Sequence, residues 1–308
     1  MLTRLRKPPS SDWVAVSFSG DRAELARVHR GGSDAPEVQV LAAVPYAKGE
    51  ERGALKALRK YLTTGRITLL LHSGEYQFLQ TDTPSVPAQE RNEALRWQIK
   101  DMVDFPVEDA TLDAVPIPQA AGGRTAQCWV AVAANAVIQS KIHLFQEAKL
   151  PLSVIDVPEL CQRNVAQLFE EPGRALALLS LTDAGGLLSF TYQGELYGSR
   201  RIDISVDQLT NAPPERRESM LDRIGLDVQR SIDNFDRNYA SIALTRLLVT
   251  PMPDAKGFMN SLRSNISIPV GPMDPTSVLT VKKAPELSDP VRCAQALMTL
   301  GGALRDES

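Results

Sequence analysis

The stretch ERNEALRWQIKDMVDFPVEDA, residues 90–110, predicts an amphipathic helix that stops abruptly before a proline. One apolar stripe recurs in it at helical spacing: Leu95, Ile99, Met102 and Val103. Pro87 and Pro106 bracket the segment, and the residue before a proline is disfavoured in helical conformation. Trp97 falls off the stripe, so this helix has a second surface to cover. That surface is either a second intramolecular contact or a docking face for a partner.

The block around this helix, residues 73–149, has its own pattern of elements. A short strand at 76–80 precedes the helix, and two β-forming runs, 111–117 and 127–133, flank the glycine pair at 122–123. A helix is expected at 135–148. The resulting β-α-β-β-α order predicts an inserted subdomain.

The segment before the block alternates in the manner of strands and then turns helical. Strands are expected at 13–18, 23–29 and 38–44, a helix at 54–62, and a buried strand in the apolar run 67–71. This succession is typical of an α/β layer.

The segment after the block repeats the same plan. Three strands are expected as a meander at 175–181, 186–192 and 194–202, followed by a long helix from Pro213 to Tyr239. The elements predicted beyond it are a strand at 246–249, a helix at 255–264, a polar linker at 268–290 and a last helix at 290–304.

Together, the patterns before, within and after the block predict that the chain has four parts. They are a flexible basic tail (1–12), a first lobe (13–72, 150–172 and 290–308), the insertion (73–149) and a second lobe (173–289).

Four stretches resemble one known family. EALRWQIKDMVDFPVEDATLD (93–113), VIDVPELCQRNVAQLF (154–169), DVQRSIDNFDRNY (227–239) and GGALR (301–305) are similar, in this order, to segments of the PilM/MshI family of pilus biogenesis proteins. The similarity is closer to MshI, of the mannose-sensitive haemagglutinin (MSHA) pilus, than to PilM. It implies a two-lobed actin-like fold of the ASKHA and FtsA kind, of class α/β, with an inserted subdomain in the first lobe.

The resemblance also implies a nucleotide cleft, whose expected residues are replaced here. Actin-like ATPases carry an Asp and glycines on a hairpin in each lobe, for Mg²⁺ and phosphate. The first hairpin of this chain has Ser17 and Ser19, then Gly20 and Asp21; the second has Ser180 and Thr182, then Asp183 and Gly185. The glycine pair expected in the adenosine loop is replaced by Thr250 and Pro251, and proline offers no N–H. We therefore expect a degenerate cleft without a cofactor or metal. The alternative is retained ATP and Mg²⁺ binding, with Asp21 and Asp183 compensating and Gly185–Gly186 cradling a phosphate.

Two acidic residues in the crossover have two interpretations. Asp156 and Glu159 match positions that the family often keeps near the cleft. Alternatively, Asp156 is the N-cap of the helix 157–169 and Glu159 lies in its favourable first turn.

Composition excludes several classes of function. The net charge of −3 offers no global basic field for nucleic acid, and no apolar run approaches the roughly 20 residues that span a bilayer. The N-terminal residues lack the apolar core of a secretory signal. Three scattered cysteines are expected to be reduced thiols in a cytosol. Arg4, Arg6 and Lys7 belong either to a disordered tail or to a weak contact with an anionic membrane surface.

Two functions remain open. The first is a non-catalytic cytoplasmic scaffold at the bacterial inner membrane, peripheral to it, in a type IV or MSHA pilus platform. The resemblance implies that it grips the cytosolic N-terminal peptide of a bitopic, PilN-like partner, with an assembly ATPase as a further partner. The groove is expected between the inserted helix and the hairpin after it, with Trp97 as a candidate anchor. The second is an active actin-like ATPase coupled to pilus assembly. A third option, a type II secretion component, would require a transmembrane helix after the fold.

Overall fold

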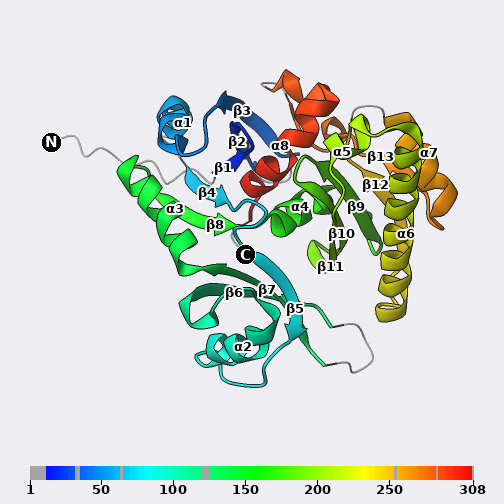
Figure 1. Cartoon of the computed structure of the whole chain (residues 1–308), viewed down its shortest axis with the longest axis horizontal. Helices are drawn as coiled ribbons and strands as arrows, with labels where there is room; N and C mark the ends of the chain where they lie inside the picture. Colours follow the sequence, from blue (N-terminus) through cyan, green and yellow to red (C-terminus); the bar gives the residue numbers. More distant parts are fainter. Residues whose placement is uncertain are drawn as a thin grey trace.

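The computed structural model describes residues 12–31, 35–62, 65–119, 125–252, 255–281 and 284–306. The expectations for the tail before Asp12 and for the glycine pair at 122–123 lie outside these residues. The described chain forms two five-stranded sheets and a separate three-stranded sheet (Figure 1).

The first lobe is built on the sheet β3-β2-β1-β4-β8. Its strands are β1 (Trp13–Ser19), β2 (Arg22–His29), β3 (Glu37–Pro45), β4 (Arg66–Leu70) and β8 (Leu152–Asp156). One face packs against α1 (Glu51–Leu58), the short helix η1 (Arg59–Tyr61) and α3 (Asn135–Glu147). Leu55, Leu58 and Phe145 are fully buried there.

The second lobe repeats this plan with the sheet β11-β10-β9-β12-β13. Its strands are β9 (Ala175–Thr182), β10 (Gly185–Tyr192), β11 (Glu195–Ile202), β12 (Leu244–Val249) and β13 (Val270–Pro272). Its outer face is covered by α5 (Val206–Asn211), α6 (Pro214–Asn238) and α7 (Ala255–Asn265). The apolar stripe of α6 buries Ile224, Val228, Ile232 and Phe235 against the sheet.

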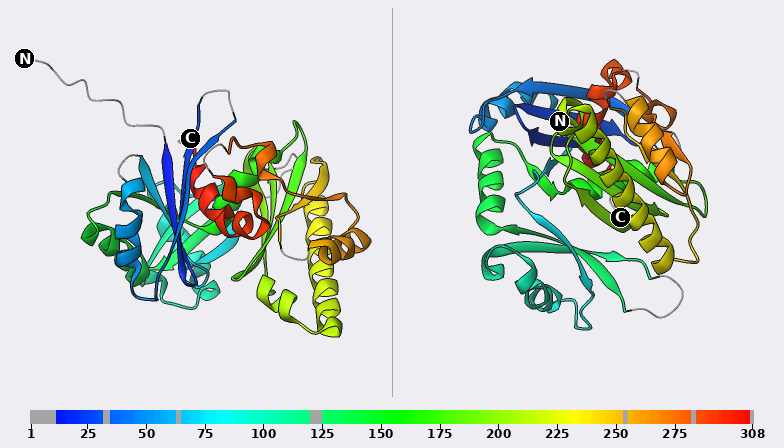
Figure 2. Two further views of the ribbon diagram at one scale, coloured as in Figure 1. Left: turned by 90° about the horizontal axis from the view of Figure 1, so that it is seen from above. Right: turned by 45° about the vertical axis from the view of Figure 1, so that its right-hand side comes forward.

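Two helices lie between the sheets, as Figure 2 shows: α4 (Pro158–Ala166), extended by η4 (Gln167–Phe169), and α8 (Pro290–Ala303). They cross closely because α8 presents Gly301, where a Cβ atom would lie 2.0 Å from the Cys161 carbonyl oxygen. The expected linker contains β13 and two short helices, η5 (Pro275–Ser277) and η6 (Pro285–Ser288). It returns to the first lobe, where Thr280 bridges to Glu37 on β3.

The insertion is the sheet β5-β7-β6, made of β5 (Gln77–Asp82), β6 (Ala110–Ile117) and β7 (Gln127–Ala134). The helix predicted from the sequence is α2 (Arg91–Ile99), continued by η2 (Lys100–Met102), and a further short helix, η3 (Val107–Asp109), leads into β6. Leu95 and Ile99 are fully buried against the sheet. Met102 is 44% exposed, so its place in the apolar stripe was wrong: the chain tightens into η2 before reaching it.

The α/β, two-lobed fold expected from the sequence is confirmed, since 13–45 and 175–202 lie in separate sheets. The residue boundaries of the four predicted parts stay a prediction. All three cysteines are buried free thiols. None of the described helices combines the length and the apolar character needed to cross a membrane.

Candidate functional site

A cleft of about 630 Å³ opens between the two lobes. The β1–β2 turn and the β9–β10 turn meet at it, together with the end of β4, α5 and α8. The structure thus brings together the eight residues predicted on the two hairpins, Ser17, Ser19, Gly20, Asp21, Ser180, Thr182, Asp183 and Gly185. Thr250, Pro251, Asp156 and Glu159 are not among its lining residues.

The two serines that replace carboxylates are engaged in hydrogen bonds inside the molecule. Ser17 Oγ lies 2.7 Å from Thr299 Oγ1 on α8. Ser180 Oγ donates to Gln162 Oε1 on α4 at 2.6 Å. Each serine therefore fastens its strand to one of the central helices, and neither brings a negative charge to the cleft.

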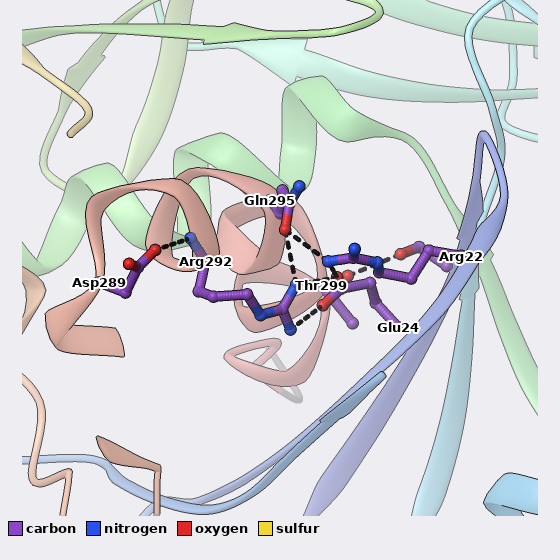
Figure 3. A network of polar contacts seen from close by, with 7 residues as sticks. Arg22, Glu24, Asp289, Arg292, Gln295 and Thr299 are labelled. Atoms are coloured by element: carbon purple, nitrogen blue, oxygen red, sulfur yellow. Dashed lines mark hydrogen bonds and ion pairs between the residues drawn. The ribbon is translucent and has the colours of Figure 1, made fainter. Parts of the chain in front are cut away.

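A polar network fixes α8 to the first hairpin (Figure 3). Arg292 holds both carboxylate oxygens of the buried Glu24, at 2.6 and 3.2 Å. Gln295 Oε1 accepts hydrogen bonds from Arg292 and Arg22, both at 2.7 Å. Asp289 caps α8 by accepting from the Arg292 N–H. The bidentate contact raises the pKa of Arg292, and both cations near this wall of the cleft are engaged.

Three carboxylates face the mouth of the cleft: Asp21, Asp183 and Asp207. Burial, followed by repulsion from Asp207, raises the pKa of Asp183 above its usual value; Asp21 adds to the repulsion, and Arg22 opposes it. Charge crowding of this kind disfavours a polyphosphate at the same place.

The residues at the two hairpins and after β12 differ from the Asp and glycine pattern expected for a Mg²⁺–nucleotide. Within the described ranges, no three His, Cys, Asp or Glu side chains are grouped so that they could hold a metal ion. Thr250, where a glycine was expected, is buried, and its N–H donates to the Leu179 carbonyl at 3.0 Å, which continues the pairing of β12 with β9. The glycines Gly20 and Gly185 keep positive φ angles, as tight turns require.

Asp156 is not a helix cap, contrary to one of our interpretations. The N-cap of α4 is Val157, without a side-chain cap. Asp156 instead accepts from the Val157 N–H at 2.8 Å and from Arg305 Nη1 at 2.6 Å. Burial raises the pKa of Asp156, and Arg305 opposes that rise. The residue joins β8 to the end of α8.

Glu159 does lie in the first turn of α4, but it is buried and carries a contact between the lobes. Arg201, on β11, donates to Glu159 Oε1 from Nη2 at 2.8 Å and from Nε at 3.0 Å. Tyr76 donates its hydroxyl to Glu159 Oε2 at 2.6 Å. Sequence reasoning missed Arg201 and Tyr76. Arg201 lies 42 residues and Tyr76 lies 83 residues from Glu159 in the chain, and nothing in their local sequence indicates that they contact it.

A second cavity, of about 570 Å³, opens between the first lobe and the insertion. We call it the α3–β8 groove. Two outer strands face it, β8 of the first sheet and β6 of the insertion. Its apolar lining comes chiefly from these strands and from α3: Leu112, Ile138, Ile142, Phe145, Leu152 and Val154.

The α3–β8 groove shares one of the two walls predicted for a peptide groove. The β6–β7 hairpin lines it, but α2 does not; its other helical wall is α3. α2 packs on the opposite side of the insertion sheet, in a cluster that includes Cys128 and Val130.

Trp97 lies outside both cavities. It is 69% exposed on α2, with the Lys100 ammonium 5.4 Å from its ring centre. The interpretation of Trp97 as a second intramolecular contact is therefore wrong. The tryptophan that makes such a contact is Trp129, which is buried, stacks on Phe78 and donates Nε1–H to the Leu196 carbonyl of the second lobe at 2.9 Å.

Comparison with known proteins yields structural matches alone. No family model matches the sequence, and no curated protein matches it. A chain of the PilM–PilN type IV pilus biogenesis complex is similar, with a TM-score of 0.74 and 19% identity over 97% of this chain and 99% of that one. The cytoplasmic domain of EpsL, an inner-membrane component of the Vibrio cholerae type II secretion system, has a TM-score of 0.51 and 12% identity over 96% of each chain. A Bacteroides thetaiotaomicron protein with an actin-like ATPase fold has 0.53 and 10%, over 94% and 96%. At these identities the likeness establishes the two-lobed actin-like fold.

Proposed function

We propose that this chain is a scaffold of a pilus biogenesis platform at the cytoplasmic face of a bacterial inner membrane, holding the cytosolic tail of a bitopic, PilN-like partner. The α3–β8 groove is the observation that carries the proposal. The likeness of the whole chain to a chain of a PilM–PilN complex also supports the proposal. So do the four sequence stretches that resemble PilM and, more closely, MshI of the MSHA pilus.

The groove suits an extended peptide with apolar anchors. Outer strands offer unpaired backbone groups to which a peptide can add as a further strand. β6 carries Pro116, a residue that sheets tolerate at their edges. On α3, Ile142 is 40% exposed at the groove, so its side chain is available without opening the core. A peptide that covered it would bury apolar surface from both the first lobe and the insertion.

A matched pair of variants tests the proposal. Ile142→Asp places a charge in the groove, whereas Leu226→Asp places the same charge at a 50% exposed leucine on α6, remote from it. The titrant is a synthetic peptide of the partner's cytosolic N-terminal segment, measured by calorimetry. Because a central contact is worth about 2 kcal/mol or more, Ile142→Asp should weaken binding about 30-fold and Leu226→Asp should leave it unchanged. Wild-type protein that binds no such peptide would refute the proposal.

Trp97 is proposed as a separate contact, not as part of the groove. An exposed tryptophan on a rigid helix is a frequent anchor at protein interfaces. Its partner on the platform would be a protein other than the groove peptide, and an assembly ATPase is our candidate.

We further propose that the cleft between the lobes is degenerate and that the chain acts without ATP hydrolysis. The serines bound to α8 and α4 and the crowded carboxylates support this. The alternative, an active actin-like ATPase, draws on the size of the cleft and on Gly20 and Gly185 at its turns. Thermal shift separates the two, since ATP with Mg²⁺ at 100 times its Kd would stabilise the fold by about 2.7 kcal/mol.

A further inference from the structure

The segment Leu71–Tyr76, which we call the connector, runs from the cleft between the lobes to the α3–β8 groove. Leu71 lines both cavities. His72 and Ser73 line only the cleft, and Tyr76 lines only the groove. One six-residue segment therefore reaches both sites.

Arg201 ties the connector to the second lobe. Its guanidinium donates to Ser73 Oγ from Nη1 at 3.0 Å, to Tyr76 Oη from Nη2, and to Glu159 Oε1. The same cation lies over the Tyr76 ring, 5.2 Å from its centre. One side chain of β11, itself lining the cleft, thus holds the connector at two positions, Ser73 and Tyr76.

The connector is also tied to the helical wall of the groove. Glu75 pairs with Lys141 on α3 at 2.5 Å. Its other carboxylate oxygen accepts from the His72 N–H at 2.8 Å, which closes the connector on itself. Through this ion pair the connector is joined to α3, the helix that forms one wall of the groove.

We propose that the connector, held by Arg201, couples occupancy of the groove to closure of the two lobes. A peptide in the groove packs against Tyr76 and α3, steadies the connector and keeps Arg201 seated across the lobes. By thermodynamic reciprocity, opening the lobes weakens the hold on the peptide by the same factor. The two states are the open and the closed arrangement of the lobes, and a ligand in the cleft or a peptide in the groove favours one of them over the other. That the occupant of the groove is a peptide rests on the proposed function, whereas the coupling between the groove and the lobes does not.

The first test uses the full chain without any peptide. Hydrogen exchange is measured on Arg201→Met and on a matched control, Arg200→Met, which removes the neighbouring arginine of β11 and its 2.8 Å pair with Asp227 of α6. Arg201→Met should speed exchange in the connector and in α3 by about five-fold or more. Arg200→Met should leave both segments as in the wild type.

A second variant guards against simple misfolding. Arg201→Met leaves the buried Glu159 without its cation, whereas Tyr76→Phe keeps that ion pair and the aromatic lining of the groove. Tyr76→Phe should speed exchange in α3 while lowering the melting temperature less than Arg201→Met does, because the buried Glu159 keeps its cation. If neither variant changes exchange in α3, the coupling is refuted, whether or not a peptide binds.

The second test adds the synthetic peptide of the PilN-like partner's cytosolic segment. In the wild type it should slow exchange at residues 182–186, the β9–β10 turn, which the groove does not touch. In Tyr76→Phe the peptide should still bind, but the slowing at that turn should be lost. Peptide that binds the wild type and protects the groove alone overturns the coupling. Peptide that does not bind overturns the proposed function, while the peptide-free exchange still decides the coupling.

Discussion

Gly301→Ala should be among the most damaging single-methyl additions in the chain. A Cβ atom at Gly301 would lie 2.0 Å from the Cys161 carbonyl oxygen and 2.6 Å from its carbon. Normal contacts begin near about 3.5 Å, so α8 and α4 would have to separate by more than about 1 Å. Main-chain atoms cannot rotate away as a side chain does, and both helices are packed between two sheets.

The expected cost follows from this rigidity. Overpacking a core costs about 1–3 kcal/mol and occasionally more, and a backbone clash belongs at the upper end, so we expect a loss of about 3 kcal/mol. Gly302→Ala should cost less, because its Cβ would meet side-chain atoms only: Leu70 Cδ1 at 2.7 Å, a tip that can turn, and Ala15 Cβ at 3.0 Å, which requires a small shift. Gly257→Ala on α7 is the matched control: nothing lies within 4 Å of its Cβ, and alanine favours the helix by about 0.5–1 kcal/mol.

Urea unfolding followed by circular dichroism measures all three variants under one condition. The order of stability should be Gly257→Ala above the wild type, then Gly302→Ala, then Gly301→Ala. Gly301→Ala within about 0.5 kcal/mol of the wild type would refute the close crossing of α4 and α8.

Three further outcomes are expected. Trp97→Ala should change the free energy of unfolding by less than about 0.5 kcal/mol and, if Trp97 is an anchor, should lower capture of the platform partner in pull-downs; a large loss of stability would contradict its exposure. Ser180→Ala should cost about 1–3 kcal/mol, because the buried Gln162 loses its donor, and a neutral result in urea unfolding would argue against that hydrogen bond. Asp183→Asn should be more stable than the wild type at pH 7. The folded-state pKa of Asp183 is raised, so its ionisation opposes folding; this advantage should disappear as the pH falls through that pKa towards about 4, and a gap that widens in acid would contradict the assignment.

The repeated strand pattern predicted the architecture well, because alternation and turn residues are local signals. Pairs that join distant segments were not predictable, since the partner of Arg201 or of Ser180 lies on an element that only folding brings near. The error over Asp156 has the same origin: a carboxylate before a helix favours capping locally, but burial beside Arg305 decides its role.

Trp129 and Trp97 show how far the burial of a tryptophan could be predicted from the sequence. Trp129 lies on a strand whose alternate residues Cys128, Val130 and Val132 face α2. A large aromatic side chain between them indicates a second buried face, and strand alternation alone would have identified it. Trp97, in contrast, lies off the apolar stripe of α2, and whether another element would cover that face could not be read from the local sequence.

The placement of the tryptophans gives the protein three built-in optical reporters. Trp13 is buried in β1, Trp129 at the contact between the insertion and the second lobe, and Trp97 in contact with solvent. Emission from Trp97 should be red-shifted and open to a soluble quencher, while the other two emit in the blue. A partner that covers α2 would protect the quenchable fraction alone, whereas parting the insertion from the second lobe would add Trp129 to it. A single quenching curve can therefore distinguish docking on the outside of the insertion from movement between the lobes.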